Sequence, residues 1–347
     1  MNQVTSVKPN LLEIRRTMLE VLDTRSKDVI TRRFGLKNEQ KETLEKIGKE
    51  YGITRERVRQ IEANAKKTLA GLENTWKPAY ESLLEIFRQY GGVMAEEHII
   101  KAVQTRLDEN ISGNTIVFFL VLLPGFIEAA PSKVFGPHWR HESALHPHIE
   151  AAVLEASTIL KKKGHPIPGS ELLSEIRSSL NLSAQELSDD AAQAALTASI
   201  SIRPTVFGQW GLSTWAETNP RGVADKAYTV LRRNSKPSHF RDITKLINEA
   251  RFDQKTANAQ TVHNELIKDG RFVLVGRGLY GLKEWGYMSG TVADVLEAIL
   301  KKTSQPLTSD ELVNKVLEQR IVKKNTILLS LQNGKRFQKT PSGYTLA

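Results

Sequence analysis

Residues 43–62, TLEKIGKEYGITRERVRQIE, constrain the fold more than any other part of the chain, because their spacing is that of two helices joined by a tight turn. In the first segment Leu44, Ile47 and Tyr51 recur at three- and four-residue steps, which predicts a helix that buries this face. Gly48 lies on or beside the same face, where a missing side chain lets a second helix approach closely.

The second segment has a recognisable start and two distinct faces. Gly52 can adopt the left-handed backbone that ends a helix, and the hydroxyl of Thr54 can cap the next one. The predicted buried stripe of this second helix consists of Val58, Ile61, Ala65 and Leu69. The other face presents two pairs spaced four apart, Arg55 with Arg59 and Glu56 with Gln60, so each pair is adjacent on the surface.

Those polar side chains have the chemistry that reads base edges in the major groove. Arg can bridge O6 and N7 of guanine, Gln can pair with adenine, and Glu can accept from the cytosine amino group. Arg57 and Lys67 are better suited to phosphates, which fix register without reading sequence. The predicted DNA-binding residues are therefore Thr54, Arg55, Glu56, Arg57, Arg59, Gln60 and Lys67.

Residues 19–69, which join LEVLDTRSKDVITRRFGL to TLEKIGKEYGITRERVRQIEANAKKTL, resemble region 4 of the primary bacterial sigma factors. The resemblance implies binding to a −35 promoter element and docking on the flap of the RNA polymerase β subunit. By position it makes Arg55, Glu56, Arg59 and Gln60 the base readers. The sequence departs from the family at Asn64-Ala65-Lys66, where a basic residue and an alanine-leucine pair are usual. No segment resembles the part that melts the −10 element, so a complete sigma factor is not expected. The competing interpretation is a degenerate helix-turn-helix kept for protein binding.

Charge and composition favour a nucleic-acid partner. The 347 residues have a net charge of +10, and residues 1–80 hold 17 Lys and Arg against 11 Asp and Glu. More than half of the positive excess therefore lies in the segment that resembles a DNA reader. The chain has no cysteine and no apolar run long enough to span a bilayer, and residues 1–10, MNQVTSVKPN, do not form the apolar core expected of a signal peptide. We expect a cytoplasmic, nucleoid-associated protein without membrane contact.

The remainder of the chain is internally repetitive. Similar segments begin at Ile86, Ile159, Val230 and Ile299, at intervals of roughly 70 residues. Each contains the end of one helix, a polar turn and a second helix; a third helix follows, near Asn114, Ala191, Gln260 and Asn325 respectively. Each repeat then closes on a short β pair, the pattern of a winged helix. We predict a mainly α chain with a helix-turn-helix domain at 1–80 and winged helices at 81–145, 146–217, 218–287 and 288–347.

The third repeat, about residues 222–285, resembles the HARE-type winged helix found in the δ subunit of RNA polymerase; the resemblance rests on KAYTVLRR, KPSHFRDITKLI and GRFVLVGRGLYGLKEW. It implies DNA binding or assembly on DNA. Candidate secondary DNA contacts in the last two repeats are Lys268, Arg271, Arg277, Lys323, Lys324, Lys335 and Arg336. The third helices of the first two repeats, IVFFLVLL and AAQAAL, are apolar or nearly uncharged, which favours protein contact or scaffolding.

Little in the sequence points to catalysis. His138, His141, His146 and His148 lack the carboxylate or thiol partners of a metal site, so a polar linker between two winged helices is expected there. Gly276-Arg277-Gly278 lies inside a hairpin and does not open a helix, so it is a turn and not a phosphate loop. Trp139, Trp210, Trp215 and Trp285, at the ends of hairpins, are expected to close small cores. No enzyme, cofactor or metal is predicted.

Three functions fit these features. The first is a regulator of transcription initiation that binds double-stranded DNA at a −35-like sequence, with RNA polymerase core as a further partner. The second is a polymerase accessory subunit with little DNA specificity of its own. The third is a DNA-recognition subunit of a restriction or defence system.

Overall fold

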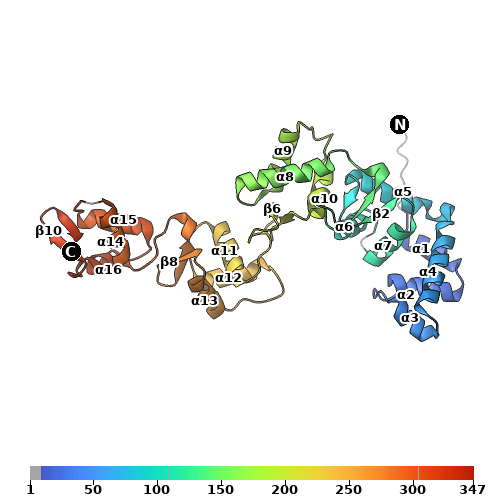
Figure 1. The fold of residues 1–347 in the computed structure, drawn as a ribbon, viewed down its shortest axis with the longest axis horizontal. Helices are drawn as coiled ribbons and strands as arrows, with labels where there is room; N and C mark the ends of the chain where they lie inside the picture. Colours follow the sequence, from blue (N-terminus) through green and yellow to red (C-terminus); the bar gives the residue numbers. More distant parts are fainter. Residues whose placement is uncertain (1–8, 109, 304) are drawn as a thin grey trace. The chain divides into compact units, whose positions relative to one another are not determined.

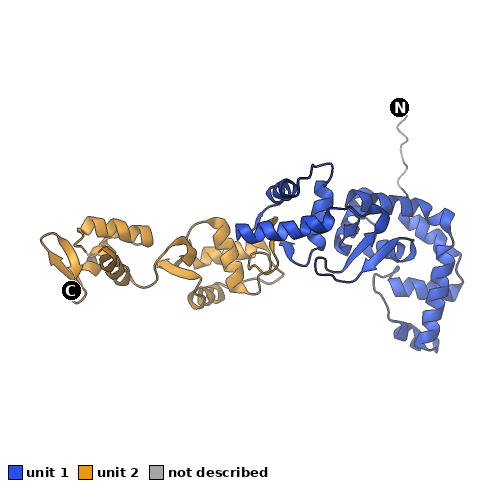
Figure 2. Cartoon of the chain, turned by 45° about the horizontal axis from the view of Figure 1, so that its top comes forward, with its two compact units in different colours: residues 1–203 blue, residues 204–347 orange. Residues whose placement is uncertain are grey.

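The structure is a computed structural model and describes residues 9–108, 110–303 and 305–347. It is mainly helical with small antiparallel sheets (Figure 1), and it divides into two compact units, residues 1–203 and 204–347 (Figure 2). The predicted mainly α class, with small sheets, is thereby confirmed. The predicted boundaries of five domains stay a prediction.

The first unit begins with a helical domain whose short helices start at side-chain caps. Thr43 and Thr54 each accept a hydrogen bond from the backbone three residues ahead, and Gly35 and Gly52 end the helices before them in the left-handed conformation. These caps confirm the predicted helix, turn and helix. The helices are α1 (Leu11–Glu20), α2 (Thr24–Phe34), α3 (Leu44–Tyr51), α4 (Arg55–Ala70) and α5 (Glu73–Gln89).

Helix α5 carries the hydrophobic core from this domain into the next. Trp76 near its start donates its indole N–H to the carbonyl of Ala70, while Phe87 near its end packs edge-on against Phe126 at 5.0 Å. The predicted boundary between residues 80 and 81 falls inside α5, and one continuous core reaches from α1 to β3. The elements that follow are β1 (Val93–Met94), α6 (Glu96–Arg106), α7 (Gly113–Leu122), β2 (Phe126–Ala129) and β3 (His138–His141).

Strand β3 lies between β1 and β2, so the first repeat closes on three antiparallel strands where the sequence predicted two. The extra strand is only two residues long, too short to show a period in the sequence. The predicted polar linker is wrong at its start, because His138 and His141 belong to β3 and are buried. The ring of His141 packs against Phe126, and burial lowers its pKa.

The rest of the first unit leads into the second. Its elements are η1 (Glu142–Ala144), α8 (Ile149–Lys163), β4 (Ile167–Pro168), α9 (Gly169–Leu180), α10 (Asp189–Ala198) and β5 (Ile202–Pro204), and β6 (Gln209–Leu212) follows. Ala191, Ala192, Ala194 and Ala195 of α10 are buried, which accounts for the uncharged composition of residues 191–196.

The second unit contains two similar arrangements, each with its own core. In the first, β9 lies between β7 and β8; in the second, β10 pairs with β11, and Leu307 forms a bridge to Tyr344. The first consists of α11 (Val223–Asn234), β7 (Ser238–His239), α12 (Phe240–Ala250), α13 (Ala259–Lys268), β8 (Phe272–Gly276), β9 (Leu279–Leu282) and η2 (Lys283–Trp285). The second consists of α14 (Val292–Thr303), α15 (Ser309–Gln319), α16 (Lys324–Leu331), β10 (Phe337–Thr340) and β11 (Gly343–Leu346).

Candidate nucleic-acid interface

Helix α4 is held by a small core that leaves one of its faces in solvent. Val58 of α4, Ile47 of α3 and Val29 of α2 are fully buried against one another. Gly48 permits this packing, because a Cβ built there would lie 2.8 Å from the carbonyl oxygen of Ile53. Tyr51 is an exception to the predicted buried face: it is exposed, and its hydroxyl donates to Asp28 at 2.8 Å. A phenol at that position satisfies its hydroxyl only by turning outward.

All the predicted DNA-binding residues of this domain lie on the exposed surface; they are Thr54, Arg55, Glu56, Arg57, Arg59, Gln60 and Lys67. The hydroxyl of Thr54 is already used, since it accepts from the backbone N–H of Arg57 at 3.2 Å. The side chains of Arg55 and Lys67 form no ion pair within the described part of the chain. These two cations are therefore available to an incoming anion.

The other four predicted DNA-binding side chains of α4 pair with each other at a spacing of three. Nε of Arg59 donates to one oxygen of Glu56 at 2.9 Å, and Nη2 of Arg59 donates to the other at 2.7 Å. Nη1 of Arg57 donates to Gln60 Oε1 at 3.1 Å. The bonds from Arg59 hold the pKa of Glu56 below its ordinary value, so this carboxylate stays an acceptor at neutral pH. Because α4 is continuous, Arg55 with Arg59 and Glu56 with Gln60 remain surface neighbours at a spacing of four, and these hydrogen bonds add contacts at a spacing of three.

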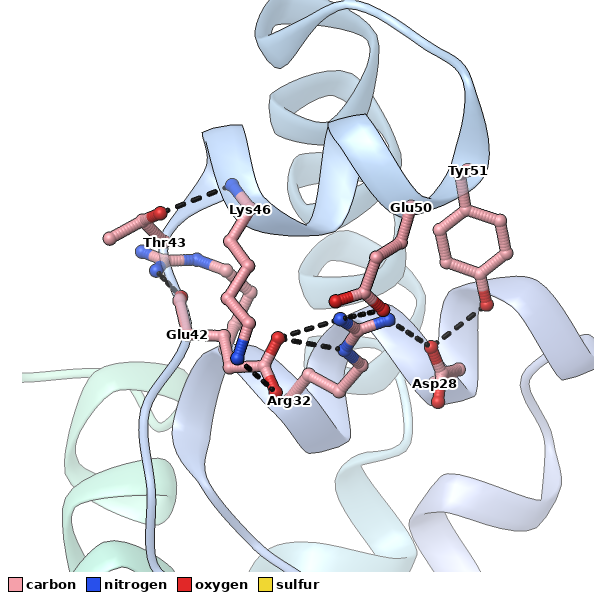
Figure 3. Close-up of polar contacts among 8 residues, drawn as sticks. Asp28, Arg32, Glu42, Thr43, Lys46, Glu50 and Tyr51 are labelled. Atoms are coloured by element: carbon pink, nitrogen blue, oxygen red, sulfur yellow. Dashed lines mark hydrogen bonds and ion pairs between the residues drawn. The ribbon is translucent and has the colours of Figure 1, made fainter.

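The angle between α2 and α3 is fixed by Arg32, which the sequence analysis did not single out (Figure 3). Its guanidinium donates to Glu42 at 2.6 Å and to Glu50 of α3 at 2.5 Å, and it lies 3.6 Å from Asp28. The bond to Arg32 is the largest cause that holds the pKa of Glu42 below its ordinary value. Only the four-residue spacing of Asp28 and Arg32 was readable in the sequence.

A partly buried ion pair joins α2 to α4. Nε of Arg33 lies 3.1 Å from the carboxylate of Glu62, which Lys66 also contacts at 2.7 Å. Burial raises the pKa of Glu62, but the bonds and charges of Lys66 and Arg33 outweigh burial and leave the pKa below its ordinary value. Glu62 is the one acidic residue on the buried side of α4, and its ion pair with Arg33 joins α4 to α2.

The candidate secondary contacts in the second unit fall into two groups. Lys268, Arg277, Lys323 and Lys335 are exposed and form no ion pair within residues 204–303 and 305–347. The other three are engaged: Arg271 with Asp225 and Asp269, Lys324 with Asp310, and Arg336 with Asp294. The first group leaves more positive charge for phosphates than the second.

The tryptophans, metal sites and membrane helices that the sequence raised can be checked in the residues that the structure describes. Trp139 and Trp210 are buried, as expected of rings that close small cores, and Trp215 and Trp285 are half-buried. No group of three or more His, Asp or Glu within residues 9–108, 110–303 and 305–347 is placed to hold a metal ion. None of the helices in that same part of the chain has the length and apolar character needed to cross a membrane.

Comparisons with known proteins match two of these regions. Residues 18–70 match the family described as Sigma-70, region 4, and residues 221–285 match the HARE-HTH family, a helix-turn-helix domain whose description names ASXL and restriction endonuclease. RNA polymerase sigma factor SigA of Lactococcus lactis subsp. cremoris is 46% identical over 63 residues, which are 17% of this chain and 17% of that protein. SigA of L. lactis subsp. lactis strain IL1403 is 46% identical over 63 residues and is matched over 16% of its length. Both resemblances recognised in the sequence are thereby confirmed, and the chain spans about a sixth of the relatives that it matches.

Proposed function

We propose that this protein binds double-stranded DNA with a sequence preference, reading a −35-like element through the exposed face of α4. The observation that carries the proposal is that a helix-turn-helix matched to sigma region 4 presents Arg55, Glu56, Arg59 and Gln60 to solvent. Lys67 and Arg57 supply phosphate contacts on the same helix. The winged helices add further contacts to DNA or to RNA polymerase.

The test is a binding selection from random duplexes, followed by titration of the selected and scrambled sequences at one salt concentration. Because a good bidentate contact contributes about 1–3 kcal/mol of discrimination, replacing Arg55 and Arg59 together by Ala should remove the preference. The matched control is Lys161→Ala with Lys162→Ala, which removes the same charge from exposed positions on α8. A double variant of α4 that still prefers the selected duplex contradicts the proposal.

We also propose that the protein associates with RNA polymerase core, docking on the flap of the β subunit. The match of residues 18–70 to sigma region 4 and to SigA supports this partner. Core polymerase should co-purify with the full chain after nuclease treatment. The Arg55→Ala, Arg59→Ala variant is the control, because it should still retain polymerase if protein contacts hold the complex. Complete loss of polymerase on nuclease treatment contradicts this association.

A DNA-recognition subunit of a restriction or defence system is the alternative, because the description of the family matched at residues 221–285 also names restriction endonucleases. Genome-wide crosslinking separates the two functions. Peaks that gather at promoters support a role in transcription initiation, and peaks without relation to promoters support the alternative.

A further inference from the structure

The third helix of the first winged-helix repeat packs against the helix-turn-helix domain. Helix α7 contacts α1, α2 and α4 (Figure 1). The ring of Phe118 meets Phe34 of α2 edge-on at 5.4 Å. This contact explains why α7 is apolar nearly all round. Its buried residues are Thr115, Ile116, Val117, Phe118, Phe119, Leu120 and Leu122.

The first turn of α7 also holds the loop between α2 and α3. Nδ2 of Asn114 donates to the carbonyl of Gly35 at 3.2 Å and to the carbonyl of Glu39 at 3.0 Å. The fit is close, since a Cβ built on Gly35 would lie 2.8 Å from Nδ2 of Asn114. Glu39 has a φ of 61°, which side-chain-bearing residues rarely adopt, so the loop depends on its surroundings for this conformation.

The end of the same loop is hydrogen-bonded to two arginines of α2 that contact α3 and α4. Its last residue before the cap of α3 is Glu42. The carboxylate of Glu42 accepts a hydrogen bond from Arg32, and its backbone carbonyl accepts one from Arg33. Arg32 bonds to Glu50 on α3, and Arg33 bonds to Glu62 on α4. A continuous set of contacts therefore leads from Asn114 to the helix that presents Arg55 and Arg59.

We propose that Asn114 is a positioning residue for DNA reading: the first winged helix braces the loop at residues 35–42 and so fixes the orientation of α3 and α4. This inference rests on the proposed function. Asn114 itself lies on a helix packed into protein and contacts no base or phosphate in this proposal. The third helix of this repeat serves as an internal brace, whereas, among the described residues, α13 of the third repeat ends in the unpaired Lys268 and the unpaired Lys323 precedes α16 of the fourth.

The experiment uses the full chain with Asn114→Ala, which removes both hydrogen bonds. Loss of two such bonds should weaken binding of the selected duplex roughly five- to thirty-fold. The slope of log K against log salt should not change, because no phosphate contact is lost, whereas Lys67→Ala should reduce its magnitude by about 0.9. Asn114→Gln, which keeps the amide donor, should recover part of the affinity. Asn110→Ala is the control, since the side chain of Asn110 donates to Asp108 and, among the described residues, to no group of the helix-turn-helix domain.

Hydrogen exchange of the free proteins separates this inference from the proposed function. If the brace exists, amides of residues 44–62 should exchange faster in Asn114→Ala than in the wild type, with Asn110→Ala unchanged. Wild-type affinity and exchange in Asn114→Ala overturn the inference, and so does a reduced salt slope, which makes Asn114 a phosphate ligand. If the wild type prefers no duplex, both the proposed function and the positioning role of Asn114 in DNA reading are wrong. Faster exchange in Asn114→Ala would then show only that Asn114 stabilises the helix-turn-helix domain.

Discussion

The ionisation of Glu62 makes the stability of the helix-turn-helix domain depend on pH. The carboxylate of Glu62 is buried and contacts both Arg33 and Lys66. Its pKa is lowered in the folded protein, so the ion pairs contribute fully at pH values above the unfolded pKa of about 4.3. As the pH falls through the folded value, the carboxylate takes up a proton and that contribution is lost.

Glu62→Gln should therefore lower the free energy of unfolding at pH 7 by about 1.5–3 kcal/mol, the usual contribution of hydrogen bonds to charged groups. The difference between wild type and variant should shrink as the pH falls below about 4.3. Urea denaturation at several pH values measures both effects. Glu45→Gln is the control, because Glu45 is exposed and its ion pair, within residues 9–108, 110–303 and 305–347, is with Lys49 on the same helix. An equal difference at pH 7 and pH 3 would show that packing, and not ionisation, accounts for the loss.

At the scale of the elements, the sequence predicted helix boundaries correctly where the residues that set them lie within one helix or one turn. Gly52 and Thr54 specify the end of α3 and the start of α4 through backbone geometry and a cap, and both were predicted. Tyr51 was misplaced because helical spacing cannot distinguish a buried ring from one that turns outward to Asp28. The two-residue strand β1 was missed because it forms only by pairing with β3, over forty residues later.

The contacts that position α4 could not be predicted from the sequence, because they also join residues far apart along the chain. Arg33 and Glu62 are 29 residues apart, and Asn114 and Gly35 are 79 residues apart. No periodicity links such pairs; they meet only after α1, α2, α4 and α7 have packed around one core. The apolar sequence of α7 did predict contact with protein, but its partner, the helix-turn-helix domain, is visible only in the structure.

For the whole molecule, we propose that the first unit reads the DNA sequence and that the second unit contacts phosphates. The sigma-like match lies in the first unit, and the match at residues 221–285 lies in the second. The proposed base-reading residues lie on α4, while Lys268, Arg277, Lys323 and Lys335 give the second unit exposed positive charge. Specificity and general attraction to DNA should therefore respond to different substitutions.

Replacing Lys268, Arg277, Lys323 and Lys335 together by Ala should lower the affinity for selected and scrambled duplexes alike. If each contacts one phosphate, the slope of log K against log salt should become shallower by about 3–4, at about 0.9 per contact. The ratio of the two affinities at one salt concentration should stay that of the wild type, because phosphate contacts carry no direct sequence information.

The matched control for that variant replaces Lys133, Lys161, Lys162 and Lys302 by Ala, four exposed lysines outside the proposed contacts. It changes the net charge equally, so any effect of overall charge on association appears in both proteins. A slope that falls as much in the control as in the variant would assign the effect to long-range attraction, and the second unit would then contact no phosphate through these four side chains. A changed affinity ratio in the variant alone would instead place part of the sequence reading in the winged helices.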